Sequence, residues 1–349
     1  MKYRQLGQTG LYVSELCLGT MTYGNAGFWE VMGGLDQAAV SAQLKYAFDR
    51  GINFIDTANV YSLGQSERLV GQAIRDLGLP REELVISTKA TGIMNELPNG
   101  RGQSRFHLMN EVDASLRRLH LDHLDLYLLH GLDPLTPLEE ALGTLNDLVR
   151  SGKVRYIGLC NMAAWQIMKG LAISEKRGWA RFAAVQAYYT IAGRDLEREV
   201  VPLIRDQGLG LMIWSPLAGG LLTGKFSPDG KGPGDSRRSK FDFPVVNKER
   251  AFRCVDAMRP MAEQRGVSVA RIALAWILAQ QPVTSVIVGA RTIEQLKDNL
   301  EAAEVVLNAE ELEMLNQVSQ LPEEYPGWML ERQKQYRAEV PERSGCKAA

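Results

Sequence analysis

The sequence has 349 residues, of which 45% are hydrophobic, and its formal net charge is only −1. A chain of this length can form two ordinary domains or one large α/β barrel, and its interspersed charges argue against nucleic acid or a membrane surface as the main partner. No run approaches the roughly 20 apolar residues of a membrane span, and the N-terminus lacks an apolar signal-peptide region. The four cysteines show no paired spacing, which favours free thiols: they are Cys17, Cys160, Cys254 and Cys346. We therefore expect a soluble cytoplasmic protein.

Short apolar runs alternate with stretches of helical periodicity along most of the chain. The first run, 16–20, precedes a helix that Asp36 would cap and Gly51 would end. Thr136 would cap a later helix, with Pro137 at its first position. Seven further runs, bounded by turn residues and rich in β-branched or aromatic side chains, are 52–56, 84–89, 124–130, 154–159, 182–186, 209–214 and 284–288. The pattern predicts eight strands, each followed by at least one helix.

Strict alternation of strand and helix predicts a parallel sheet with right-handed crossovers. Eight such units in a chain of this size indicate an α/β fold of the (β/α)8 TIM barrel type, whose active site forms at the C-terminal strand ends. The alternative, a doubly wound sheet, would need a G-x-G-x-x-G fingerprint after its first strand, and residues 24–27 do not fit it. We predict one barrel domain over 1–349, with its core in about 1–320 and a C-terminal tail in about 321–349.

Three segments exceed what a minimal barrel needs: 21–35, 218–247 and the tail. Loops of this length are usually functional or disordered. The first segment and the tail carry aromatic residues, namely Tyr23, Phe28, Trp29, Tyr325, Trp328 and Tyr336. These rings either pack the extra loops onto the barrel or line an apolar substrate pocket. On the second hypothesis, Tyr23, Phe28 and Trp29 contact the substrate.

Asp56, Lys89 and His130 stand at the ends of three of the predicted strands, and Tyr61 follows the first of them closely. A phenol has an ordinary pKa of about 10, and a cation within roughly 4–6 Å favours the phenolate and lowers that value toward neutrality. A buried ammonium needs a counter-charge, which Asp56 can supply. His130 can donate to, or polarise, the same oxygen. Together these residues predict an enzyme site with Tyr61 as general acid.

The segments 54–61, 86–89 and 125–130 resemble the signature of the aldo-keto reductases. The resemblance runs over nearly the whole chain and is closest to the branch that contains the potassium-channel β subunits and related bacterial aldo/keto reductases. In that family the residue matching Tyr61 donates the proton and the lysine matching Lys89 lowers its pKa. The resemblance implies further that Asp56 holds the lysine, that His130 orients the carbonyl, and that the cofactor is NADP(H).

The resemblance also implies a nicotinamide nucleotide site along the later strand ends. Residues 158–162 stand where the family has Gly-Leu-Ser-Asn-Phe, so Asn161 and Gln186 would hold the carboxamide, while Cys160 replaces a serine and is a weak hydrogen-bond partner. Trp214 would stack on the nicotinamide ring, and the following backbone would meet the diphosphate. The complete predicted cofactor set is Gly19, Thr20, Met21, Asp56, Cys160, Asn161, Gln186, Trp214, Ser215, Pro216, Leu217, Gly219, Gly220, Leu222, Lys225, Arg237, Gly289, Arg291, Gln295 and Asn299.

The adenosine end of the cofactor would lie along residues 287–295, which run from a strand into a helix N-terminus, a natural phosphate site. Many family members carry a cation early in this stretch, where Gly289 is neutral here. Arg291 is the candidate for a 2′-phosphate, with Arg237 or Arg238 of the long loop as helpers. The alternative for the two loop arginines is solvated surface charge.

Two other kinds of site are less consistent with the sequence. Residues 219–225 match G-x-x-x-x-G-K, but Phe226 stands where a P-loop needs Ser or Thr for Mg²⁺, so an ATPase is disfavoured. His120 and His123 suggest a metal, yet His130 lies seven residues beyond His123, at about 3.3 Å per residue. We therefore predict no metal and two histidines at the strand's entry side.

We expect an NADP(H)-dependent oxidoreductase that reduces a ketone or aldehyde to an alcohol by hydride transfer, with Tyr61 as proton donor. Its small-molecule carbonyl substrate would also contact His130, and the aromatic mouth loops favour a bulky or cyclic compound. One alternative is a cofactor-sensing regulatory subunit resembling the potassium-channel β subunits. Another is a non-redox barrel such as a phosphate-sugar isomerase, which would leave Trp214 and Gln186 without a role. The sequence leaves the oligomeric state open.

Overall fold

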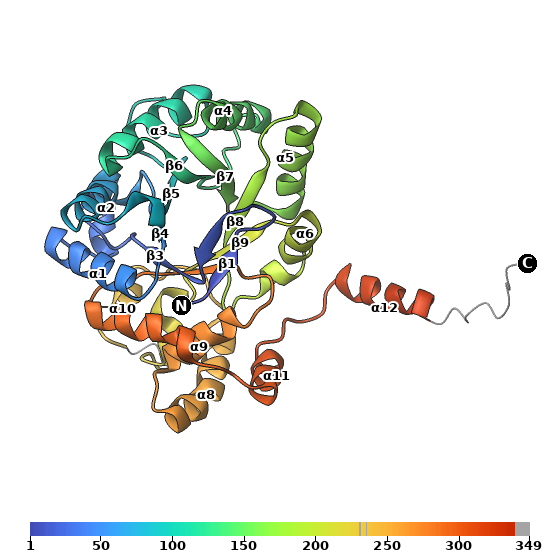
Figure 1. Ribbon diagram of the computed structural model, residues 1–349. Coiled ribbons are helices and arrows are strands. Elements are labelled where there is room, and N and C mark those ends of the chain that lie inside the picture. Colours follow the sequence, from blue (N-terminus) through green and yellow to red (C-terminus); the bar gives the residue numbers. More distant parts are fainter. Residues whose placement is uncertain (230–231, 235, 339–349) are drawn as a thin grey trace, which may run out of the picture. The chain divides into compact units, whose positions relative to one another are not determined.

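Eight parallel strands close into a barrel in the order β10–β3–β4–β5–β6–β7–β8–β9 (Figure 1). The computed structural model describes residues 1–229, 232–234 and 236–338. The barrel strands are β3 (Leu16–Gly19), β4 (Phe54–Asp56), β5 (Val85–Ala90), β6 (Leu124–Leu129), β7 (Val154–Cys160), β8 (Phe182–Tyr188), β9 (Gly210–Trp214) and β10 (Ser285–Val288). The prediction of a (β/α)8 barrel is confirmed, because each strand lies beside its neighbour in the chain and β10 returns to β3.

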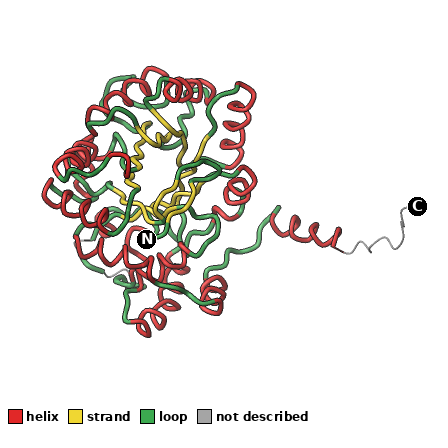
Figure 2. The backbone as a smooth tube through the Cα atoms, in the orientation of Figure 1, coloured by secondary structure: helices red, strands yellow, loops and turns green. Residues whose placement is uncertain are grey.

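Helices surround the barrel on its outside (Figure 2). They are α1 (Gln37–Asp49), α2 (Gln65–Asp76), α3 (Arg105–Leu119), α4 (Leu138–Arg150), α5 (Ala164–Arg177), α6 (Val200–Gln207), α7 (Arg237–Lys240), α8 (Lys248–Arg265), α9 (Val269–Leu278), α10 (Ile293–Leu300) and α11 (Ala309–Val318). A hairpin of β1 (Tyr3–Gln5) and β2 (Tyr12–Ser14) precedes the barrel. Within the described residues, none of these helices is long and apolar enough to cross a membrane.

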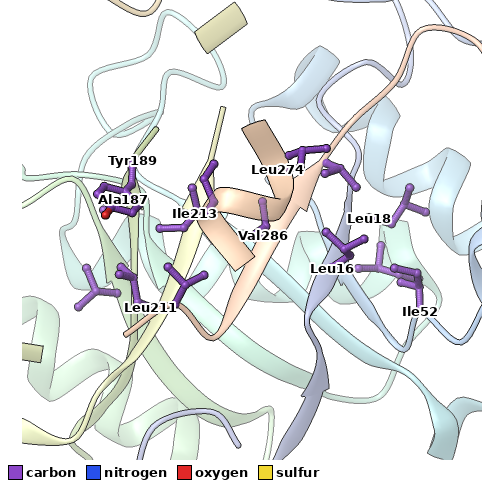
Figure 3. Packing of buried hydrophobic residues seen from close by; sticks show 14 of the residues in the cluster. Leu16, Leu18, Ile52, Ala187, Tyr189, Leu211, Ile213, Leu274 and Val286 are labelled. Atoms are coloured by element: carbon purple, nitrogen blue, oxygen red, sulfur yellow. The ribbon is translucent and has the colours of Figure 1, made fainter. Parts of the chain in front are cut away.

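The hydrophobic core has two layers, because successive side chains of a strand point to opposite faces. On β3, Leu16 and Leu18 point outward, where they join Val286 and the helix residue Leu274 in one cluster (Figure 3). Cys17, between them, belongs to a smaller cluster that fills the barrel interior. The barrel is therefore a packed core and not a pore, so a ligand site must lie at one end of it.

Local signals set the helix starts, with one correction. Asp36 caps α1 as predicted, since its Oδ1 accepts from the Ala39 N–H at 2.9 Å. The prediction that Thr136 caps α4 is wrong, because the N-cap is Pro137. The Thr136 hydroxyl donates to Asp133 Oδ2 at 2.6 Å, and no side chain caps the first turn of α4.

The chain divides into two compact units, Met1–Ser319 and Gln320–Ala349. The first contains the barrel. The described part of the second contains α12 (Gly327–Ala338), and its aromatic residues Tyr325, Trp328 and Tyr336 are exposed. Three cysteines are buried free thiols, namely Cys17, Cys160 and Cys254, and Cys346 lies outside the described residues.

Candidate active site

The four residues of the predicted acid–base set meet at the C-terminal ends of three adjacent strands. Asp56 is the last residue of β4, Lys89 lies one residue before the end of β5, and His130 directly follows β6. Tyr61 begins the short 3-10 segment η2 (Tyr61–Gly64) after β4. Parallel strands of a barrel end at the same face. These four side chains therefore lie together, although Asp56 and His130 are the ends of a stretch of 75 residues.

The Lys89 ammonium is fully buried, and all three of its donor positions are used. It donates to Asp56 Oδ2 at 2.6 Å, to the carbonyl of Thr57 at 2.7 Å and to the Tyr61 hydroxyl at 3.3 Å. An ammonium has only three N–H groups, so this arrangement fixes the direction of the one that reaches the phenol. The lysine therefore positions the Tyr61 oxygen as well as supplying charge.

Asp56 is held in turn by two further donors. Its Oδ1 accepts from the Ser87 hydroxyl at 2.5 Å and from Gln186 Nε2 at 2.9 Å. Ser87 was not singled out from the sequence, although it stands two residues before Lys89 on β5 and so shares its face of the strand. The carboxylate is thus fully hydrogen-bonded, which offsets the cost of burying it.

Burial and neighbouring charges shift the pKa values of Lys89 and Tyr61. Burial lowers the pKa of Lys89, but Asp56 and Tyr61 raise it more, so the amine stays charged. Burial raises the pKa of Tyr61, and Lys89 lowers it only in part. Lys89 lowers the pKa of the phenol as expected, but the net pKa is raised and not brought toward neutrality, because desolvation outweighs the lysine and the Asp56 charge adds to the rise. The phenol keeps its proton at neutral pH, as a proton donor must.

His130 is neutral at physiological pH. Burial and the nearby Lys89 charge lower its pKa to about 3. Its ring meets the Tyr61 ring edge-on, with 5.8 Å between centroids, and its backbone N–H donates to Ala90 O at 3.0 Å. A neutral imidazole still has one N–H, which can hydrogen-bond to a substrate oxygen beside the phenol.

Gln186 keeps an acceptor and Asn161 keeps a donor that can bind a primary carboxamide. Asn161 follows β7 directly, and its Oδ1 accepts from the Trp214 indole at 2.8 Å. Its Nδ2 makes one long bond, 3.4 Å, to His130 O, so a second N–H remains. Gln186 uses Nε2 on Asp56, which leaves Oε1 as an acceptor. One donor and one acceptor match the C=O and NH₂ of nicotinamide, so the residues present fit that group.

Two arginines lie beside the predicted diphosphate segment. A side chain at Gly219 would come within 2.6 Å of Arg237 Nη2, so only glycine allows the guanidinium this close to the backbone. Arg238 is buried and pairs with Asp242 at 2.9 Å, so it stabilises the fold of the loop. Burial and Arg238 lower the pKa of Arg237, whose Nη2 donates to Phe243 O at 3.0 Å. With five N–H donors, Arg237 can also meet a phosphate.

Residues at the predicted adenosine end of the cofactor site hydrogen-bond to one another. Thr292 caps α10, and Gln295 Oε1 accepts from the backbone N–H of Arg291 at 3.0 Å. Asn299 is nearly buried, with Nδ2 at 3.5 Å from Gly289 O. The two amides that were expected to reach one ligand therefore serve first to shape the segment that carries Arg291.

Some predicted contact residues turn their side chains away from the mouth. Tyr23 is fully buried and donates to Gln43 Oε1 at 3.2 Å, so it is not a substrate residue as the structure stands. Thr20, Cys160 and Leu222 are also fully buried, so neither their side chains nor their backbone groups are accessible at the mouth. Cys160 ends β7 and Thr20 directly follows β3, as predicted, but the sequence could not show that these side chains are buried.

Aromatic rings form a continuous series around the mouth. Trp29 meets the Tyr61 ring with 5.1 Å between centroids, and Phe28 meets Phe241 at 5.2 Å. The series continues from Phe241 to Phe243 at 5.5 Å and from Phe243 to Trp214 at 5.8 Å. It thus links the phenol to the predicted nicotinamide shelf. Phe241 and Phe243 were missed because the loop 218–247 has no period that would place them.

No group of three or more His, Cys, Asp or Glu side chains in the described ranges is arranged to hold a metal ion. His120 is exposed and ends α3 in a left-handed conformation. His123 lies 3.7 Å from Asp125.

Known proteins resemble the chain over most of its length. The model described as the aldo/keto reductase family matches residues 15–320. The "Uncharacterized oxidoreductase YrpG" of Bacillus subtilis (strain 168) is 38% identical, over 91% of this chain and 96% of that protein. The versiconal hemiacetal acetate reductase of Aspergillus parasiticus is 34% identical, over 91% and 96% respectively. The "Probable voltage-gated potassium channel subunit beta" of Oryza sativa subsp. japonica is 36% identical, over 88% and 92%.

Proposed function

The chain belongs to the aldo/keto reductase family of oxidoreductases, and from that premise we propose that it uses NADP(H) to reduce a ketone or aldehyde to an alcohol, with Tyr61 as proton donor. One observation carries the proposal. A buried ammonium, Lys89, donates to a carboxylate, a carbonyl and the phenol of Tyr61 at the mouth of the barrel. A phenol held in this way is both protonated and able to lose its proton to a neighbouring oxygen.

The side chains act in a fixed order on the carbonyl oxygen. When bound, the nicotinamide supplies the hydride, with Asn161, Gln186 and Trp214 holding its ring. The neutral imidazole of His130 donates to the carbonyl oxygen and orients it. As negative charge develops there, Tyr61 gives up its proton, and the Lys89 ammonium stabilises the phenolate that remains. The aromatic rings around the mouth exclude water from this transfer.

The preference for NADP(H) over NAD(H) rests on two arginines. Arg291 stands one residue before the N-cap of α10, where a helix N-terminus already favours an anion. Arg237 stands beside Gly219 in the predicted diphosphate segment. Guanidinium groups grip phosphate oxygens in pairs, so these positions suit a cofactor that carries a 2′-phosphate. A cytoplasmic location remains a prediction from the sequence.

The test is a screen of NADPH oxidation across aldehydes, quinones, steroid-like ketones and sugar ketones, with wild type and Tyr61→Phe measured in parallel. We expect steady-state turnover with at least one class and its loss in the variant. NADPH binding without turnover on any carbonyl would reject the reductase proposal.

NADPH binding without turnover on any carbonyl would favour a cofactor-sensing regulatory subunit. The similarity to the rice channel subunit supports this alternative. Co-purification of the chain with a membrane protein, dependent on bound NADPH, would then be the decisive observation.

A further inference from the structure

The backbone directly after Tyr61 turns through three consecutive left-handed residues. Their φ values are 49° at Ser62, 51° at Leu63 and 85° at Gly64. Glycine adopts this region freely, but serine and leucine reach it only at a conformational cost. Residues held in such a region persist where the surrounding structure determines them, and they are concentrated at functional sites. This turn directly follows the proposed proton donor, so the contacts that hold the turn also bear on the position of the phenol.

Contacts on two sides hold the turn. Ser62 is almost fully buried, and its hydroxyl donates to the carbonyl of Tyr23 at 3.1 Å. Tyr23 is itself buried and fixed to Gln43, so the acceptor cannot move easily. On the other side, Gly64 lies against Arg118, since a Cβ there would be 2.6 Å from Arg118 Cδ.

Arg118 is anchored as well. Its guanidinium pairs with the fully buried Glu67 of α2 and, at 3.2 Å, with Glu111 of α3. Glu111 also accepts from Asn59 Nδ2 at 2.9 Å, and Asn59 lies two residues before Tyr61. Contacts of Asn59 before Tyr61, and of Ser62 and Gly64 after it, therefore hold the loop that carries the phenol.

The left-handed turn separates Tyr61 from α2. Right-handed values at residues 62–64 would let the segment continue into α2 as one helix, and Tyr61 would then follow the axis of that helix. With the turn in place, Tyr61 does not follow the axis of α2, and its hydroxyl lies 3.3 Å from Lys89 Nζ. That distance is at the long end of a hydrogen bond, so a small shift of the loop would break it.

We propose that Ser62 is a positioning residue for Tyr61: its hydroxyl, bonded to the Tyr23 carbonyl, holds the left-handed turn and thereby keeps the phenol on Lys89. The inference rests on the proposed role of Tyr61 as proton donor. The Ser62 hydroxyl donates to Tyr23 O and takes no part in the hydrogen bonds of Lys89, so it would act through the backbone turn. Removing its hydroxyl should loosen the Tyr61–Lys89 bond and leave the nucleotide-binding strand ends unchanged.

The test compares Ser62→Ala with Ser285→Ala. Both serines are buried and donate to a backbone carbonyl, but Ser285 bonds to Ser14 O at the start of β10, on the opposite end of the barrel from the mouth. The ¹³Cζ chemical shift of Tyr61 is measured by NMR at neutral pH on ¹³Cζ-labelled tyrosine, assigned with Tyr61→Phe; it reports the contact of the phenol oxygen with Lys89 and needs no substrate. Steady-state kcat and KM for NADPH are measured on each variant.

We expect Ser62→Ala to shift the ¹³Cζ resonance of Tyr61, because the phenol loses part of its contact with Lys89, and to lower kcat about 10- to 100-fold, with KM for NADPH unchanged. Ser285→Ala should change neither. A Tyr61 ¹³Cζ shift and a kcat equal to wild type in Ser62→Ala would overturn the proposal and leave Ser62 a purely structural residue. Because the NMR measurement is independent of turnover, it decides the matter even if the chain proves not to reduce carbonyls.

Discussion

Gln186 donates a hydrogen bond from Nε2 to Asp56 Oδ1 at 2.9 Å, on the carboxylate whose other oxygen holds Lys89. One amide thus belongs to both halves of the site, the proposed nicotinamide grip and the acid–base set. Its Oε1 would accept from the carboxamide while its Nε2 steadies the counter-charge of the lysine. Nucleotide binding and proton transfer are therefore expected to be coupled through this side chain.

Gln186→Met keeps the length of the side chain but removes both polar groups. We expect a roughly tenfold lower affinity for NADPH, since a neutral hydrogen bond is worth about 0.5–1.5 kcal/mol, and a kcat lower by roughly tenfold or more, since a bond to a charged carboxylate is worth about 1.5–3 kcal/mol. Fluorescence titration of the nucleotide and single-turnover kinetics at saturating NADPH separate the two effects. A change in affinity alone would show that the bond to Asp56 is not needed for proton transfer.

Tyr61→Phe should reduce carbonyl turnover by about 10²–10⁴-fold or more, the usual contribution of general acid catalysis. The ring and its contact with Trp29 survive, so NADPH affinity should stay close to wild type. Steady-state kinetics and nucleotide titration on the purified variant test both halves. Activity within threefold of wild type would remove Tyr61 from the role of proton donor.

Lys89→Met should destabilise the fold more than Tyr61→Phe does. It leaves Asp56 as a buried carboxylate without its cation, and removing one partner of a buried pair costs roughly 3–5 kcal/mol. Urea denaturation of the two variants gives the comparison. The double variant Asp56→Leu/Lys89→Met is the control and should recover part of the loss. Equal stabilities for the two single variants would contradict a tightly coupled pair.

Arg291→Ala should weaken NADPH binding by about one to two decades and leave NADH nearly unchanged. A charge-assisted hydrogen bond to the 2′-phosphate contributes roughly 1.5–3 kcal/mol, and NADH has no such phosphate. The difference should shrink as salt rises, because the position is only half-buried. Both nucleotides can be titrated by tryptophan fluorescence with Trp214 as reporter. Equal losses would mean that Arg291 does not recognise the 2′-phosphate.

The depressed pKa of His130 predicts a loss of stability in mild acid. In the unfolded chain this histidine binds a proton below its ordinary pKa of about 6.5, whereas the folded site resists protonation down to about 3. The unfolded state therefore gains protons first, and stability falls as pH drops between those values. His107 and His123 also have lowered pKa values and act in the same direction. His130→Gln should flatten the dependence of Tm on pH between 7 and about 4; an unchanged slope would show that His130 does not contribute.

The sequence by itself determined the barrel and the positions of the four acid–base residues. Both depend on short-range signals, the alternation of strands with helices and the place of a polar residue at a strand end, and in a parallel barrel all such ends meet at one face. Asp56, Lys89 and His130 could therefore be predicted to converge without any coordinates. The start of α1 at Asp36 followed from the same kind of local rule.

Only the tertiary structure decided which faces and charges matter within that frame. Tyr23 was placed in the right loop but is buried against Gln43, because the fold of a loop depends on what it packs against. Phe241 and Phe243 reach the mouth from a segment without periodicity, through contacts with Phe28 and Trp214. The pKa of Tyr61 rises and does not fall, since desolvation is set by the surrounding packing and Lys89 is already paired with Asp56. Such properties arise from contacts between residues far apart in the chain, which no local pattern records.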